Sequence, residues 1–557
     1  MSVGGVGAVP RAGQVRYGRA DGRRVLVATV LGSGMAFLDA TVVNIALPHI
    51  GEQFHAGAAS LQWVVNGYTL SLASLILLGG TLGDRFGRRR VFVVGVVWFA
   101  TASLLCGLAP NVQMLIGARV LQGVGGALLA PGSLAIIEAS FHPDDRARAI
   151  GAWSGLGGVA GAIGPFLGGW LVQAATWRLV FLINVPVAAL VIVATLRGVP
   201  ESRDPDAAQR LDVAGVLTAA AGLAGLTYGF TAWPERGGSS PVVIGALALG
   251  VAGFVGFVLV ERHAREPMLP LDTFRSRAFS AANLVTFVVY AALSGVLFLV
   301  VLNLQVVVHF TALAAGTSML PLTVIMLLLS ARGGALAQRI GPRIPMTVGP
   351  IVCACAMLLF ARIGAHSMYV RDVLPAVVVL GLGLALTVAP LTATALGSVD
   401  ERHAGIASGV NNAVARAAGL LAVAVLPLAA GLGGGSLTVA ADLGPMYRRA
   451  MLICGGMLLV GALLAFVSIP TKLAAPGAAT PGDGDGGGDG SGAGSGDGDS
   501  DGDADHERRA AGEGVPDRAA VTTAVRMHCA ISGPPLQPHP PRGDGDRVTL
   551  PDAGAGE

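Results

Sequence analysis

Charged residues are scarce in this chain: they make up 13% of its 557 residues, against about 25% in ordinary soluble domains. A chain with so few charges cannot cover a compact domain with a hydrated surface, which argues against a soluble protein. Lysine is almost missing, since Lys472 is its one example, and the net charge is only +3. This balance gives no basis for nucleic-acid binding.

Cysteine is also rare, and the few cysteines do not form a metal site. Of the five, Cys353 and Cys355 are two residues apart, so on one helix they point in different directions. No G-x-x-x-x-G-K-[ST] loop is present, which excludes the usual ATP-driven mechanism. We therefore expect no metal and no cofactor. The sequence also has no nucleophile constellation, and we do not expect an enzyme.

What the sequence does contain is long apolar runs. Hydrophobic residues make up 53% of the chain, and the run from Val25 to Leu47 is too long for the core of a signal peptide. Fourteen runs are long enough to span a bilayer, which predicts an all-α membrane protein. The predicted spans are 25–47, 61–80, 91–109, 112–137, 150–172, 179–197, 211–232, 241–261, 278–303, 313–335, 345–364, 373–398, 406–433 and 446–469.

Basic residues alternate between the loops. If the N-terminus is inside, the inner segments hold 23 Lys and Arg residues and the outer segments hold six. This bias follows the positive-inside rule, and an even number of spans places both termini in the cytoplasm. We therefore expect a multi-pass protein of the inner or plasma membrane, in contact with the lipid bilayer.

The chain contains an internal repeat. The segment GGTLGDRFGRR at 79–89 matches GGALAQRIGPR at 333–343 at six of eleven positions, although Gln338 replaces the acid of the first copy. Two parallel six-helix halves with an insertion explain this offset. The predicted parts are an N-terminal cytoplasmic arm (1–24), an N-terminal six-helix bundle (25–197), two inserted helices (211–261), a C-terminal six-helix bundle (278–469) and a disordered cytoplasmic tail rich in Gly, Asp and Pro (475–557).

Very few ionisable residues fall inside the predicted spans, and such residues are functional candidates. Asp39 and Arg119 lie at nearly the same depth, roughly 12 Å below the outer face at 1.5 Å per residue. At about 4 Å and an effective dielectric near 20, an ion pair between them is worth up to roughly 4 kcal/mol. Making or breaking that contact would switch Asp39 between proton release and proton capture. The alternative is a static pair that holds two helices together.

The loop GGTLGDRFGRRR at 79–90 combines glycines that permit close helix packing with a charge network. An ordinary positive-inside loop explains the arginines, but not Asp84 or the glycine spacing. The loop resembles the signature loop of the major facilitator superfamily. The resemblance implies that the loop braces the two halves at the cytoplasmic gate. The residues that carry this motif are Gly80, Asp84, Arg85, Gly87 and Arg88.

Three other stretches resemble motifs of the fourteen-helix drug:proton antiporter subfamily. They are LDATVVNIALP at 38–48, RVLQGVGGALLAP at 119–131, whose Arg119 the resemblance links to proton coupling, and GLGGVAGAIGPFLGGW at 155–170. Small residues in the third stretch let helices touch, and Pro165 bends the helix. A generic packed helix remains an alternative to a gate helix pressed against the opposite half. The gate candidates are Gly161, Gly164, Pro165 and Gly168.

The sequence thus predicts a monomeric, proton-driven antiporter that exports small amphipathic compounds, an antibiotic among them. The alternatives are proton-coupled uptake of a nutrient or, with less support, a membrane sensor or enzyme. The scarcity of buried acids favours neutral, weakly acidic or singly charged substrates over dications. The candidate residues of the substrate cavity are Asn44, Gln122, Asn411 and Arg416.

Overall fold

The computed structural model describes residues 15–204, 211–264, 267–269, 271–398, 404–433 and 435–471. Contacts divide the chain into one unit of Met1–Leu473 with Met527–Glu557 and a second unit, Ala474–Arg526; all described residues belong to the first. The predicted tail at 475–557 and most of the predicted arm at 1–24 lie outside the described residues.

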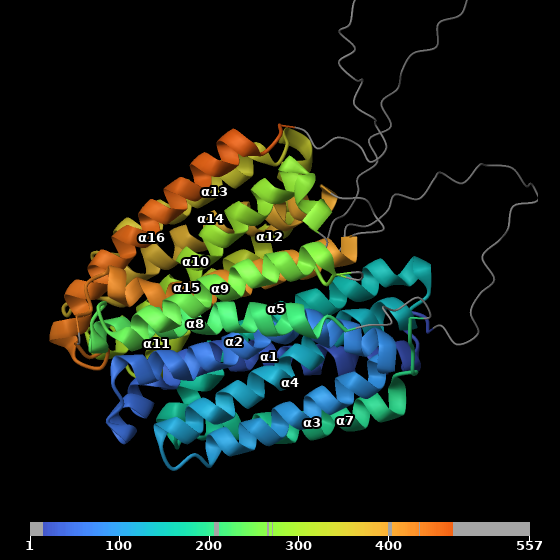
Figure 1. The fold of residues 1–557 in the computed structure, drawn as a ribbon, viewed down its shortest axis with the longest axis horizontal. Coiled ribbons are helices and arrows are strands. Elements are labelled where there is room, and N and C mark those ends of the chain that lie inside the picture. Colours follow the sequence, from blue (N-terminus) through green and yellow to red (C-terminus); the bar gives the residue numbers. More distant parts are fainter. Residues whose placement is uncertain are drawn as a thin grey trace, which may run out of the picture. The chain divides into compact units, whose positions relative to one another are not determined.

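Helices account for nearly all of the described chain (Figure 1). Fourteen of them, counting three broken pairs as one span each, are long and apolar enough to cross a membrane, so the predicted number is confirmed. The first seven α-helices along the chain form six of these spans. They are α1 (Ala20–Phe54), α2 (Ala58–Phe86), α3 (Arg88–Gly107), α4 (Val112–Ser140), α5 (Pro143–Ala174), α6 (Leu179–Leu182) and α7 (Asn184–Gly198). We call α1–α7 the N-terminal half.

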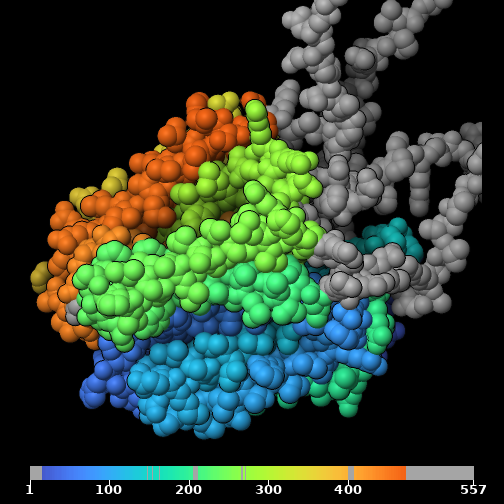
Figure 2. Space-filling model, in the orientation of Figure 1, coloured from blue at the N-terminus to red at the C-terminus, as the bar shows by residue number. Residues whose placement is uncertain are grey.

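Two helices follow, α8 (Val213–Arg236) and α9 (Pro241–His263), which pack closely on each other. Helix α8 contacts both α2 and α15, so it lies against both halves of the protein. In Figure 2 this green segment runs between the blue N-terminal and the orange C-terminal parts of the chain.

The remaining elements form the C-terminal half, α10–α16, in which every long helix packs on at least one other. Their bounds are α10 (Arg277–Val306), α11 (Ala312–Ser318), α12 (Leu320–Ile340), α13 (Arg343–Phe360), α14 (Leu374–Gly397), α15 (Ala404–Ala429) and α16 (Ala440–Ser468). The short η1 (Leu271–Arg275) precedes α10, and the π-helical turn η2 (Tyr369–Val373) precedes α14.

Local sequence sets many helix ends. The side chains of Asn111, Asp212 and Thr311 accept hydrogen bonds from the backbone at the starts of α4, α8 and α11. Glycines with positive φ follow α2 and α12, namely Gly87 and Gly341. Capping side chains and glycines therefore explain where these helices begin or end.

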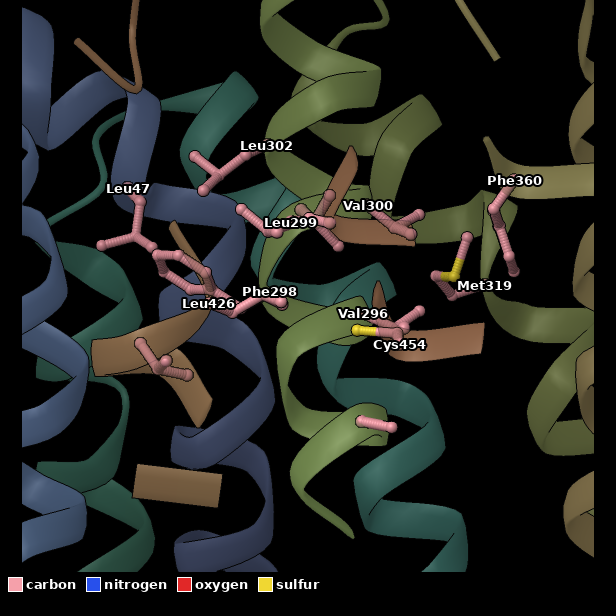
Figure 3. Close-up of a cluster of buried hydrophobic side chains, with 14 of the residues drawn as sticks. Leu47, Val296, Phe298, Leu299, Val300, Leu302, Met319, Phe360, Leu426 and Cys454 are labelled. Carbon is pink, nitrogen blue, oxygen red and sulfur yellow. The ribbon is translucent and has the colours of Figure 1, made fainter. Parts of the chain in front are cut away.

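The largest hydrophobic cluster crosses from one half to the other. It joins Leu47 and Phe181 of the N-terminal half to Phe298, Phe360 and Leu426 of the C-terminal half. Figure 3 shows the side chain of Leu47 beside those of Phe298 and Leu299 from α10. The two halves are therefore held together by a common apolar core over part of their length.

Candidate proton-coupling site and gates

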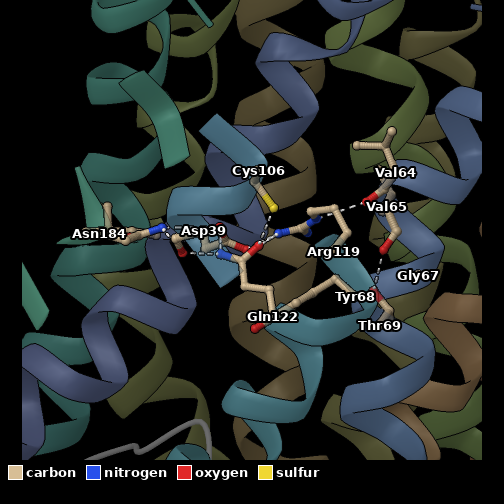
Figure 4. A network of polar contacts seen from close by, with 12 residues as sticks. Asp39, Val64, Val65, Gly67, Tyr68, Thr69, Cys106, Arg119, Gln122 and Asn184 are labelled. Atoms are coloured by element: carbon tan, nitrogen blue, oxygen red, sulfur yellow. Dashed lines mark hydrogen bonds and ion pairs between the residues drawn. The ribbon is translucent and has the colours of Figure 1, made fainter. Parts of the chain in front are cut away.

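Asp39 and Arg119 form a direct ion pair inside the N-terminal half. Arg119 Nη1 donates to Asp39 Oδ2 at 2.6 Å, and each residue is only 1% exposed. The second carboxylate oxygen, Asp39 Oδ1, accepts a 2.7 Å hydrogen bond from Gln122 Nε2. Gln122 Oε1 in turn accepts from Arg119 Nη1 at 2.7 Å, which closes a ring of three side chains (Figure 4).

A second layer of polar groups surrounds this ring. Asn184 Nδ2 lies 3.4 Å from Asp39 Oδ1 and 3.3 Å from Ser103 Oγ, and Gln122 Nε2 donates to the same hydroxyl at 2.8 Å. Arg119 Nε donates to the carbonyl of Val64 at 3.0 Å. The site therefore draws on five helices, α1, α2, α3, α4 and α7.

Aromatic rings cover the guanidinium group of Arg119. Its Cζ lies 4.4 Å from the ring centroid of Tyr68 and 5.7 Å from that of Phe181. A cation over an aromatic face is attracted to it even where water is excluded. The positive charge is thus satisfied on all sides by a carboxylate, an amide, a carbonyl and two rings.

The arrangement fits a carboxylate and does not fit a carboxylic acid. Every group that contacts Asp39 donates: Arg119 to one oxygen, Gln122 and Asn184 to the other. A proton on either oxygen would place donor against donor, and an unmet buried donor costs about 1–3 kcal/mol. Protonation of Asp39 must therefore break a contact between α1 and its neighbours, which makes the site a candidate switch.

The four residues expected in a substrate cavity lie on three helices, α1, α4 and α15. Gln122 belongs to the Asp39 network instead. Asn44 is partly buried on α1, and its Oδ1 has no hydrogen-bond partner among the described residues. Asn411 is in the C-terminal half, where its Nδ2 donates to Thr286 Oγ1 at 2.8 Å and to Asn283 Oδ1 at 3.2 Å. Arg416 lies on the same helix as Asn411.

The loop between α2 and α3 carries a charge network within the N-terminal half. Asp84 Oδ1 pairs with Arg88 Nη2 at 2.7 Å. Arg85 lies over the ring of Phe86, 5.2 Å from its centroid, and is exposed. Among the described residues, the ion-pair partner of Asp84 is in its own half of the protein.

Sequence reasoning missed Glu201, which follows α7 and holds this loop. Its Oε1 accepts from the backbone N–H of Arg89 at 3.1 Å, and its Oε2 lies 3.8 Å and 3.6 Å from the Nε atoms of Arg89 and Arg90. Gly87 has φ +112°, and a Cβ there would lie 2.7 Å from Glu201 Oε1. The conformation and the close carboxylate together explain why position 87 requires glycine.

The close helix packing at the start of this loop falls on Gly79 rather than on Gly80. A Cβ on Gly79 would overlap the carbonyl oxygen of Ala127 on α4, whereas one on Gly80 would lie 3.8 Å from Pro131. The glycine spacing therefore serves the contact of α2 with α4 inside the N-terminal half.

The glycine-rich α5 contacts both halves. Gly164 and Gly168 face Thr41 and Val42 of α1, within their own half. The carbonyl oxygen of Pro165 packs against Gly316 of α11, in the opposite half. A Cβ on Gly161 would meet nothing within 4 Å, so this residue is not a close contact. The predicted contact of this helix with the other half is present, but it involves Pro165 and Gly169.

Several contacts close the halves at one end. A Cβ on Gly169 would lie 2.6 Å from the carbonyl oxygen of Ala312 and 2.7 Å from Leu313 Cα. Gln305 Nε2 donates to the Ile45 carbonyl, and Gln62 Nε2 donates to the Val423 carbonyl, each at 3.2 Å. We call the Gly169–Ala312 and Pro165–Gly316 contacts the α5–α11 seam.

Fourteen apolar helices in two packed halves, with a buried acid–base pair in one of them, are the features of a multi-pass membrane transporter. The chain belongs to the Major Facilitator Superfamily, whose family model matches residues 29–423. This result agrees with the resemblance found in the sequence motifs.

Named relatives support the same assignment, and solved structures share the fold. The chain is 37% identical to the tetracenomycin C resistance and export protein of Streptomyces glaucescens, over 72% of this chain and 74% of that one. It is 35% identical to the puromycin resistance protein pur8 of Streptomyces alboniger, over 81% of this chain and 92% of that one. A crystal structure of a POT family transporter with a bound thioalcohol-conjugated peptide shares the fold, with a TM-score of 0.60, 14% identity and coverage of 79% and 95%.

Proposed function

We propose that this protein exports small amphipathic compounds, antibiotics among them, in exchange for protons. The observation that carries the proposal is the buried Asp39 site, whose every contact donates to a carboxylate. The named relatives, which are antibiotic resistance and export proteins, support the choice of cargo. The proton gradient drives the cycle without a cofactor, and one chain acts as a monomer.

In this mechanism the proton acts through α1. Thr41 and Val42, two and three residues after Asp39, pack against Gly164 and Gly168 of α5. Helix α5 in turn closes on α11 across the α5–α11 seam. Uptake or release of a proton at Asp39 changes the donor contacts that hold α1, and a movement of α1 would reach the seam through α5. This chain of contacts links protonation to alternating access.

We propose that both termini lie in the cytoplasm of a cell with this protein in its plasma or inner membrane. The positive-inside bias supports this orientation. The α5–α11 seam is then the closed outer gate. Reporter fusions after Arg90 should be active only with a cytoplasmic reporter, and fusions at Arg236 only with an external one. The opposite pattern at either position would invert or break the fourteen-span topology.

The transport direction can be tested in proteoliposomes with puromycin and tetracenomycin C as probes. With inside-out protein and an acidic lumen, we expect the probe to accumulate in the lumen as protons leave. Nigericin in potassium buffer removes the pH gradient and should abolish the accumulation. Accumulation only when protons enter together with the probe would instead support the uptake alternative. Equilibration without accumulation would contradict proton coupling.

A further inference from the structure

Arg416 is a cation in the middle of a membrane helix. It lies 12 residues after the first residue of α15 and 13 before the last, about 18–20 Å from either end at 1.5 Å per residue. An arginine side chain is too short to reach a membrane surface from that position, although arginines near helix ends do so. Its charge must therefore be stabilised inside the protein, by a partner, a ligand or water.

Contacts between α15 and α2 place Arg416 between the two halves. The two helices meet at Gln62 and Val423 near one end, and at Leu77 and Gly409 nearer the other. Between these points, Leu70 and Ala417 join one apolar cluster that also includes Leu223 of α8. Arg416, next to Ala417, thus lies near the level of Leu70, and so near that of Tyr68 and the Asp39 site.

Two tyrosines from different halves lie within range of this charge. Arg416 acts electrostatically on Tyr68 of α2 and on Tyr290 of α10. Tyr68 is also the ring that covers Arg119, 4.4 Å away. Arg119 and Arg416 are therefore on opposite sides of the interface between the halves, with Tyr68 close to both.

The neighbours that could neutralise Arg416 are already engaged elsewhere. Asn411 Nδ2 donates to Thr286 and Asn283 of α10. Asp39, the one acid away from a helix end among the described spans, is paired with Arg119. Within the described residues, Arg416 has no hydrogen bond or ion pair, although its side chain is partly exposed. Its five N–H donors remain available.

We infer that Arg416 binds an oxyanion on the transported molecule, so that the preferred substrates carry a carboxylate or an ionised phenol beside an apolar body. The inference rests on the proposed export function, which it makes more specific. An oxyanion would satisfy the arginine by charge-assisted hydrogen bonds. The partly exposed apolar side chains of Leu70 and Ala417 offer a surface for the remainder of the molecule.

Equilibrium binding of two dyes tests this inference. Fluorescein is an anion and rhodamine 123 is a cation built on a similar ring system. We expect Arg416→Gln to weaken fluorescein binding to the purified full chain about 10- to 100-fold, as loss of a charged hydrogen bond does. Rhodamine 123 binding should change less than about two-fold. Arg416→Lys should retain more of the fluorescein affinity than the glutamine variant, because it keeps the charge.

The control is Arg362→Gln, an exposed arginine that should leave both affinities unchanged. Equal fluorescein affinity in wild-type and Arg416→Gln protein, or a wild-type preference for rhodamine 123, would overturn the inference. Because no gradient is applied, binding is measured independently of export. Arg416-dependent binding without uphill transport would refute the export proposal alone. Export of puromycin without any effect of Arg416 on fluorescein binding would refute the oxyanion site alone.

Discussion

Replacing Asp39 with asparagine should abolish uphill export while substrate exchange across the membrane continues. Asparagine cannot take up or release a proton. Its amide also places a donor where Asp39 Oδ1 or Oδ2 now accepts from Gln122, Asn184 or Arg119, as the protonated acid would. The variant should therefore behave as a transporter fixed in its protonated form, able to bind and exchange substrate.

Two assays in the same proteoliposomes separate these effects. Accumulation driven by an imposed pH gradient measures coupling, and exchange of labelled for unlabelled puromycin at equal pH measures binding and gating. Asp21→Asn is the matched control, because Asp21 is an exposed acid on the same helix, paired only at the surface with Arg24. Normal uphill export by Asp39→Asn would refute the coupling role. Loss of folded protein would favour a static structural pair.

The depth of this site was predictable, because helix rise fixes how far each residue lies from its helix end. That argument placed Asp39 and Arg119 at one depth, and in the structure Arg119 Nη1 lies 2.6 Å from Asp39 Oδ2. The place of Gln122 was predictable too, because it is three residues after Arg119 and so lies on the same face of α4. The contribution of Ser103 and Asn184 depends on how α3 and α7 are rotated about their axes, which a single sequence does not specify.

The contacts at the gates were also predictable only in part from the sequence. Glu201 is separated from Arg89 by 112 positions and lies beyond the end of α7, so no periodicity links them. The glycine-rich stretch of α5 predicted close packing, but not which glycine faces which half. Gly164 faces α1 and Gly169 faces α11, although they are five residues apart on one helix. Helix pairing across halves is a tertiary property, and local spacing constrains it weakly.

The outer gate should fail if Gly169 is replaced with valine. The new Cβ would lie 2.6 Å from the Ala312 carbonyl oxygen and 2.7 Å from Leu313 Cα, which are backbone atoms that cannot rotate away. Overpacking of this kind costs about 1–3 kcal/mol, which corresponds to roughly a 5- to 150-fold loss of the closed population. We therefore expect export to fall roughly 5- to 150-fold, with the protein still folded and inserted.

The control is Gly456→Val, since Gly456 lies in α16 with nothing within 4 Å of its Cβ position. Both variants carry the same substitution in a membrane helix, so helix propensity alone predicts equal effects. Spin labels at Gln173 and Ala441, exposed residues of opposite halves, report the distance between the halves at this end. The labels are attached in a variant whose native cysteines have been replaced. We expect their separation to increase only in Gly169→Val. Unchanged distance together with normal export would show that the α5–α11 seam does not form the gate.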